Sequence, residues 1–160
     1  MTTSRLDRLR ALLPAQKVDC LLVSGLPNIR YLTGFTGSNA LLLLEPGSTT
    51  FYTDGRYTTQ AAEELAGTRI KIRVPKKGIW QTALDHLKTG RKKAGRRLEK
   101  TGFDSSVSYA LSQKIHEVVG EKHLRAVSGL VERLRMVKEE AEIDAIRASA
   151  ELNSRVLTEV

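Results

Sequence analysis

Two polar loops hold the residues with the most scope for chemistry. The segments "GFTGSN" at 34–39 and "TDGRY" at 53–57 combine hydroxyls, an amide, a carboxylate, a guanidinium and aromatic rings. This mixture is typical of surfaces that contact a small ligand or a peptide. The candidate residues are Phe35, Thr36, Gly37, Ser38, Asn39, Arg56 and Tyr57.

The same loops also admit a purely structural explanation. Asp54 can cap a following helix, and Gly34 and Gly37 can supply backbone with positive φ. Arg56 can pair with a nearby acid. On the sequence alone both interpretations stay open.

The chain offers little raw material for catalysis. Its three histidines, His86, His116 and His123, lie in separate segments without a second ligand at the tight spacing of a metal site, apart from ordinary glutamates. No serine stands in a G-x-S-x-G turn, and no Walker lysine or G-x-G-x-x-G loop is present. The only cysteine, Cys20, lies in the apolar run "VDCLLVSG" and is interpreted as a buried structural thiol. We therefore predict no catalytic residue and no metal site in this chain.

Alternating strand and helix patterns must position the two loops. Apolar runs at 19–25, 39–45 and 49–54 predict buried strands. Amphipathic spacing at 4–13, a proline-led segment at 27–32 and a further stripe at 55–67 predict helices. If the second and third strands form a hairpin through "EPGST", both polar loops share one rim of the sheet.

The strand and helix pattern continues to about residue 128. The segment "RIKIRV" at 69–74 alternates basic and apolar residues, which favours a strand at or near a sheet edge. Helices are predicted at 79–87 and 107–118, and short strands at 97–104 and 123–128. The predicted fold class is α/β: a three-layer sandwich whose mixed sheet of about five or six strands has helices on both faces.

The C-terminal segment differs from the rest. From Leu130 onward there is no turn residue, and the chain stops at Val160 without a helix-ending signal. We interpret it as a long C-terminal helix that opens a second domain, with a helix docked on the first domain as the alternative. The expected division is a first domain at 1–130, then a linker helix and the start of a further domain at 131–160.

The net charge of +8 arises in one segment. Between Arg69 and Lys100 twelve lysines and arginines accompany two acidic residues, and the rest of the chain is slightly acidic. The basic run at 88–100 has no aromatic residue to stack on bases, so we predict solvated surface and no nucleic-acid partner, with a nucleic-acid-binding module as the alternative. No stretch approaches the roughly 18 apolar residues that span a bilayer. We therefore expect no membrane partner and a cytoplasmic protein.

The chain contains three motifs: "YLTGF" from Tyr31, Thr53-Asp54 with Arg56-Tyr57, and Leu134-Arg135 with Lys138, Glu142 and Ile143. Together they resemble the N-terminal domain of the creatinase, prolidase and Xaa-Pro aminopeptidase family. The resemblance extends from about Ser4 to Val160.

The resemblance implies a non-catalytic N-terminal domain of a metal-dependent Xaa-Pro aminopeptidase or dipeptidase. Its partners would be its own C-terminal catalytic domain, which binds two divalent metals such as manganese or cobalt, and a second copy in a homodimer. The segment from Phe35 to Asn39, with Arg56 and Tyr57 beside it, would approach the peptide substrate, whereas Tyr31, Gly34 and Asp54 would be structural. Some relatives present a tryptophan here, but no motif around Trp80 identifies it. A creatinase-like amidinohydrolase and an inactive binding relative are the alternatives.

Overall fold

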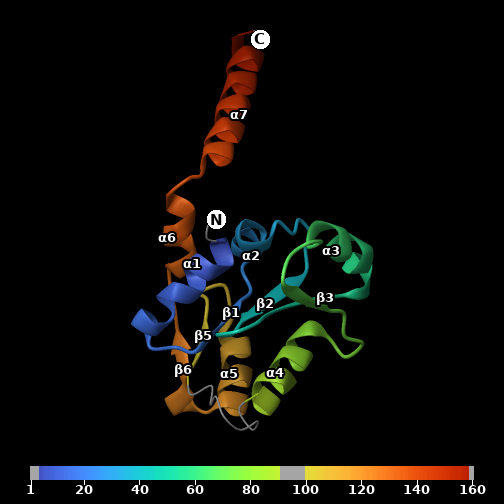
Figure 1. The fold of residues 1–160 in the computed structure, drawn as a ribbon, viewed down its shortest axis with the longest axis vertical. Helices are drawn as coiled ribbons and strands as arrows, with labels where there is room; N and C mark the ends of the chain where they lie inside the picture. The colour runs from blue at the N-terminus through green and yellow to red at the C-terminus, as the bar shows by residue number, and fades with distance from the viewer. Residues whose placement is uncertain (1–3, 91–99, 159–160) are drawn as a thin grey trace.

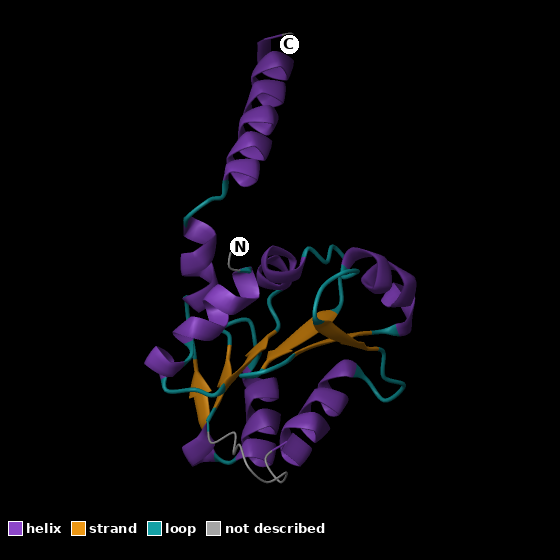
Figure 2. Cartoon of the chain, in the orientation of Figure 1, coloured by secondary structure: helices purple, strands orange, loops and turns teal. Residues whose placement is uncertain are grey.

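A computed structural model describes residues 4–90 and 100–158. A mixed six-stranded sheet forms the middle layer, in the order β4-β3-β2-β1-β5-β6. Helices cover both faces (Figures 1 and 2), so the predicted three-layer α/β class is confirmed. The elements are α1 (Arg5–Leu12), β1 (Cys20–Val23), α2 (Leu26–Thr33), β2 (Ala40–Leu44), β3 (Thr49–Thr53), α3 (Thr58–Glu64), β4 (Ile70–Arg73), α4 (Ile79–Gly90), β5 (Thr101–Phe103), α5 (Tyr109–Val119), β6 (Leu124–Ala126), α6 (Leu130–Met136) and α7 (Glu140–Thr158), with single 3-10 turns at Pro14–Gln16, Gly55–Tyr57 and Glu121–His123.

The central strands are buried on both faces. Along β2, Leu42 and Leu44 join the core beneath α1, α2, α3 and α6. Leu41 and Leu43 join the opposite core, beneath α4 and α5. Successive side chains of a strand point to opposite faces, so an unbroken leucine run serves both cores. Cys20 of β1 is buried as predicted.

The hairpin between β2 and β3 brings the two polar loops together. The strands are antiparallel, and Ala40 lies opposite Thr53. The residue before β2 and the residue after β3 therefore lie at the same end of the sheet, as predicted. Beyond β3, β4 pairs in parallel and forms the sheet edge, which confirms the edge strand expected from its alternating basic residues.

Helix α2 connects β1 to the first polar loop. Pro27 occupies its first turn, where a missing backbone N–H costs nothing. The helix ends at Gly34, whose φ of 83° lies in the left-handed region, so the expectation of positive φ is confirmed there. The expectation is wrong for Gly37, which is absent from the positive-φ residues of the described chain.

The C-terminal segment forms two helices because the chain is extended around Val137. Glu139 helps to start α7, since its backbone N–H donates to the Glu142 carboxylate over 3.0 Å, as in a capping box. Arg5 and Arg8 of α1 both bind the Glu139 carboxylate. Helix α7 then projects from the body with no buried residue (Figure 1), and its first turn contacts α1 through Glu142, which lies 3.2 Å from Arg5.

Three further predictions concern the domain boundary, the basic run and membrane-spanning helices. The predicted boundary at residue 130 stays a prediction, but α6 packs on α1 and α2, and Leu130 and Val131 belong to the core beneath them. Most of the basic run, 91–99, lies outside the described residues. No helix among residues 4–90 and 100–158 has the length and apolar character needed to cross a membrane.

Candidate functional site

Five polar residues form a connected group at the rim of the sheet, here called the rim cluster: Ser38, Asn39, Asp54, Arg56 and Tyr57. Asn39 donates its amide N–H to Asp54 over 2.6 Å. Arg56 donates to the same carboxylate from Nε over 3.0 Å and from Nη2 over 2.8 Å. Its backbone N–H adds a third bond over 3.0 Å, because Asp54 caps the 3-10 turn that follows β3. The predicted cap is confirmed.

These bonds shift the titration of the rim cluster. Hydrogen bonds from Arg56 and then Asn39 hold the pKa of the Asp54 carboxyl well below its usual range. The Ser38 hydroxyl lies 2.6 Å from the Tyr57 hydroxyl and lowers the pKa of Tyr57. The Arg56 guanidinium lies 5.3 Å from the centre of the Tyr57 ring. The cluster is thus a surface of mutually satisfied polar groups, with the Arg56 side chain 69% exposed.

Phe35 does not present its side chain at the rim, contrary to the expectation for an exposed candidate residue. Its side chain is 1% exposed and belongs to the core beneath α2 and α3. The ring centre lies 4.8 Å from that of Phe51 and 5.7 Å from that of Tyr57, both edge to face. Phe35 therefore packs beneath the loop, because removing a large apolar ring from water lowers the free energy of the folded chain.

The packing around position 37 leaves no room for a side chain, so the residue there is a glycine. A Cβ at this position would lie 2.3 Å from Cζ of Phe35 and 2.8 Å from Cδ1 of Tyr57. The glycine therefore lets the loop backbone close over the two rings. The next candidate, Thr36, is exposed and bound to α3: its hydroxyl donates to Glu64 over 2.6 Å and accepts from Gln60 over 2.8 Å.

A shallow pocket of about 270 Å³ adjoins the rim cluster. Ser38 and Asn39 line it together with Trp80, the first-turn residue of α4. No sequence motif had linked Trp80 to the loop. Their proximity depends on how α4 packs against the sheet, which local sequence does not specify.

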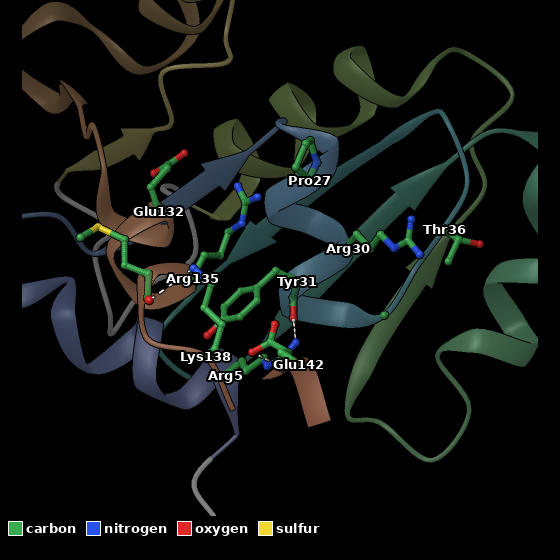
Figure 3. A pocket seen from close by; sticks show the side chains of 11 residues that line it. Arg5, Pro27, Arg30, Tyr31, Thr36, Glu132, Arg135, Lys138 and Glu142 are labelled. Atoms are coloured by element: carbon green, nitrogen blue, oxygen red, sulfur yellow. Dashed lines mark hydrogen bonds and ion pairs between the residues drawn. The ribbon is translucent and has the colours of Figure 1, made fainter. Parts of the chain in front are cut away.

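A larger pocket of about 600 Å³, here called the α2–α6 pocket, opens at the base of α7 (Figure 3). Its walls come from α1, α2, α6, the loop after α2 and the first turn of α7. The pocket is lined by Arg5, Pro27, Arg30, Tyr31, Gly34, Thr36, Glu132, Arg135, Met136, Lys138 and Glu142. Two of the motifs quoted above, far apart in the sequence, thus meet in one place.

Tyr31 ties the walls of the α2–α6 pocket together. Its hydroxyl donates to the carbonyl of Leu134 in α6 over 3.1 Å. Its own carbonyl accepts from Arg5 over 2.8 Å, and the Arg5 guanidinium lies 4.2 Å from the centre of the Tyr31 ring. Arg5 also binds Glu139 at 2.7 Å and Glu142 at 3.2 Å. Arg5 of α1 thus joins α2 to the start of α7.

Asn28 of α2 orders the opposite wall. It is 3% exposed, donates to Glu132 over 2.7 Å, and accepts from Nη1 of Arg135 over 3.0 Å. One buried amide thus holds a carboxylate and a guanidinium of α6 in fixed positions. Sequence reasoning had assigned no role to Asn28 or Arg30, and only the folded chain brings them beside α6.

The histidines do not converge. His86 accepts or donates a short hydrogen bond with the Tyr52 hydroxyl, and Nε2 of His86 lies 3.7 Å from Glu45. Burial lowers the pKa of His86 and raises that of Tyr52 to about 12. His116 instead lines a separate surface pocket beside α5. Within 4–90 and 100–158, no group of three or more His, Cys, Asp and Glu residues could hold a metal ion. The resemblance implies metals in the C-terminal catalytic domain and none in this chain.

The family model and a peptidase of known sequence both match this chain. The family model for the Creatinase/Prolidase N-terminal domain matches residues 5–137. The uncharacterized peptidase YqhT of Bacillus subtilis (strain 168) is 30% identical over 150 residues, which cover 92% of this chain and 40% of that protein.

Two solved structures extend the similarity to three dimensions. An Xaa-Pro dipeptidase from Bacillus anthracis superposes with a TM-score of 0.80 and 25% identity, over 98% of this chain and 43% of that one. The N-terminal domain of cytoplasmic peptidase PepQ from Mycobacterium tuberculosis H37Rv superposes with a TM-score of 0.68 and 31% identity, over 83% of this chain and 99% of that one. The chain thus spans about two fifths of the full-length relatives.

Proposed function

Because the chain belongs to the creatinase/prolidase N-terminal domain family, we propose that it is the non-catalytic N-terminal domain of an Xaa-Pro aminopeptidase or dipeptidase. The observation that carries the proposal is the match to the Bacillus anthracis Xaa-Pro dipeptidase, which includes 98% of this chain and leaves more than half of that protein unmatched. The unmatched part would hold the chemistry.

In this division of labour the catalytic domain binds two divalent metals, manganese or cobalt, which would supply a metal-activated water for cleaving the bond before proline. The residues of this chain would shape access to that site. The parent protein would be a cytoplasmic homodimer, and the similarity to the cytoplasmic peptidase PepQ supports this location.

The rim cluster is proposed as the wall of the substrate entrance. Its internal hydrogen bonds fix Asp54 and Asn39, so little flexibility remains to be lost when a peptide arrives. The exposed Arg56 side chain and the Tyr57 hydroxyl would contact the peptide, with Phe35 as their support from below. Thr36, Gly37 and Ser38 would form the part of the loop that faces the peptide beside Arg56 and Tyr57.

The first experiment separates this domain from catalysis. The 160-residue chain, purified and supplied with manganese, is expected to release no amino acid from an Xaa-Pro dipeptide or tripeptide. Steady release above a metal-only control would overturn the division of labour. The structure of the PepQ N-terminal domain was solved for that domain by itself, so we expect the isolated 160-residue chain to fold in this experiment.

The second experiment tests the entrance. In the full-length protein, Arg56→Ala is expected to lower kcat/KM several-fold with a much smaller change in Tm, because the guanidinium would contact the peptide in solvent. Arg69→Ala on the exposed surface before β4 is the matched control. Unchanged kcat/KM in Arg56→Ala would leave Arg56 with only its cap-supporting role.

A further inference from the structure

Strand β4 leaves one edge of the sheet open. It pairs in parallel with β3 and is the last strand in the sheet order, and no other strand among residues 4–90 and 100–158 pairs with its outer side. The Ile70 N–H is already bound to the Thr68 hydroxyl over 3.3 Å, so the open edge extends from Lys71 onward. The outward backbone N–H and C=O groups there can pair with a strand from another chain.

The side chains of β4 differ in character between the two faces of the sheet. Arg73 lies in register with Tyr52, which belongs to the core beneath α4, so Lys71 and Arg73 lie on that face. Ile72 lies on the opposite face and is 37% exposed, and Val74, which follows the strand, is exposed to the same extent. The edge therefore offers a partner a cationic row on one face and an apolar row on the other.

The cations along this edge lack acidic partners. The sequence from 70 to 84 has no aspartate or glutamate and contains four cations: Lys71, Arg73, Lys76 and Lys77. Among the described residues none of the four forms an ion pair within 4.0 Å. Glu45 lies near the same face, but its carboxylate accepts from Ser48 over 2.9 Å and lies 3.7 Å from His86. The charge of the edge is thus left for an external acid.

The charges of β4 disfavour a second copy of the chain as the occupant of this edge. If β4 paired with β4 of another copy so that like faces met, Lys71 and Arg73 would lie opposite the same two cations. Like charges directly opposite each other destabilise a strand pair, whereas opposite charges stabilise it. The same side chains that reject a second copy therefore favour an acidic strand.

We propose that β4 binds an extended acidic segment of another protein, which adds to the sheet as a further strand. Acidic residues at alternate positions of that segment would lie beside Lys71 and Arg73, and the apolar residues between them would cover Ile72. Main-chain hydrogen bonds would supply much of the affinity, and the alternating side chains would supply the specificity. The inference is separate from the rim cluster and does not depend on the peptidase proposal.

The test uses the 160-residue chain, labelled with nitrogen-15 and followed by amide NMR. The probe is the peptide acetyl-TEVEVET-amide, titrated at an ionic strength of about 0.15 M to screen long-range attraction. We expect saturable shifts at Lys71, Ile72 and Arg73, slower hydrogen exchange at alternate β4 amides, and intermolecular nuclear Overhauser effects to the peptide backbone. The scrambled peptide acetyl-TEEVVET-amide has the same charge without the alternation, and it should bind several-fold more weakly.

Variants of β4 separate the two rows. The double variant Lys71→Gln with Arg73→Gln is expected to weaken binding about tenfold, as for the loss of two cross-strand charge pairs. Ile72→Thr keeps a β-branched residue and should weaken binding several-fold. The matched control is Lys114→Gln with Lys122→Gln, which removes two exposed charges from α5 and the turn beside β6, at the other end of the sheet order. It should bind like the parent chain.

The proposal fails if the acidic peptide produces no saturable shifts, or if the scrambled peptide binds as tightly. Shifts without slower exchange of β4 amides would show adsorption by charge alone and would also overturn it. A short oligothymidylate that binds this edge more tightly than the peptide would identify a nucleic acid as the partner. A dimer of the parent chain that Ile72→Lys dissociates, measured by sedimentation, would show that a second copy covers β4. The amide spectrum of each variant reports whether it is folded.

Discussion

The rim cluster and the α2–α6 pocket share the loop at 34–39, yet they treat charge in opposite ways. In the rim cluster every charged group has a partner of opposite sign, and Asp54 alone accepts from Asn39 and Arg56. In the pocket, Arg30 and Lys138 form no ion pair within 4.0 Å among the described residues. Paired polar groups hold the rim cluster in one arrangement, whereas Arg30 and Lys138 are exposed to solvent and held by no ion pair in the described part of the chain.

The loop that separates the two regions draws its rigidity from beneath. Phe35 fills the core under the rim cluster, and Gly37 lies directly over its ring. Conversely, the pocket depends on a single buried amide, Asn28, and on Arg5. Changes beneath the loop should therefore cost more stability than changes at the exposed cations of the pocket.

The largest effect is expected from Phe35→Ala. Loss of a fully buried aromatic side chain leaves a cavity and should lower the free energy of unfolding by about 3–5 kcal/mol. Urea unfolding followed by circular dichroism measures it. Tyr109→Ala is the control, since Tyr109 is 80% exposed. A loss below about 1 kcal/mol would mean that Phe35 does not anchor the loop.

Gly37→Ala should cost less, about 1–3 kcal/mol, because its new Cβ would overlap the Phe35 and Tyr57 rings and force them to shift. Gly55→Ala is matched, as a Cβ there meets nothing within 4 Å. Thermal unfolding of the pair gives the difference. Equal Tm values in the two variants would contradict the close packing at Gly37.

Neutralising one arginine in each region compares them directly. Arg56→Gln should lower Tm slightly, by less than Gly37→Ala, because Asp54 loses its charged partner. Arg30→Gln should leave Tm nearly unchanged, since Arg30 is exposed and forms no ion pair within 4.0 Å among the described residues. If Arg30→Gln destabilised the chain more than Arg56→Gln did, the contrast between the regions would be wrong.

The smallest effect concerns acid. Hydrogen bonds from Arg56 and Asn39 lower the pKa of Asp54 in the folded chain, so the unfolded chain binds its proton first as the pH falls. The resulting stability is fully present above the ordinary carboxyl pKa of 3.8 and is lost below it. Denaturant unfolding between about pH 5 and pH 2 should show a shallower loss in Asp54→Asn than in the parent. Parallel curves would contradict this.

Much of the fold could be predicted because its signals are local. The apolar runs around Leu22 and Leu42 have the length and β-favouring neighbours of buried strands, and Gly34 ends a helix that Pro27 begins. The break between α6 and α7 was missed. Arg5 and Arg8, more than a hundred residues away, bind Glu139 beside the start of the new helix, a contact that the sequence does not show.

The candidate site was predicted in part. The antiparallel hairpin made the proximity of Asn39 to Arg56 foreseeable, since a hairpin turns its two outer ends to the same rim. The burial of Phe35 was not foreseeable, because the sequence of a loop does not indicate whether a phenylalanine ring faces solvent or the core. The α2–α6 pocket had no signal in either of its motifs taken alone.

Strand and helix patterns, the cap at Asp54 and the family motifs were readable from residue types and spacing, because each depends on neighbours within a few positions. Which side chains face inward, and which cations are left without an acid, were decided only by folding. Those outcomes depend on contacts such as Asn28 with Arg135. Such contacts form only after the sheet has brought distant helices side by side.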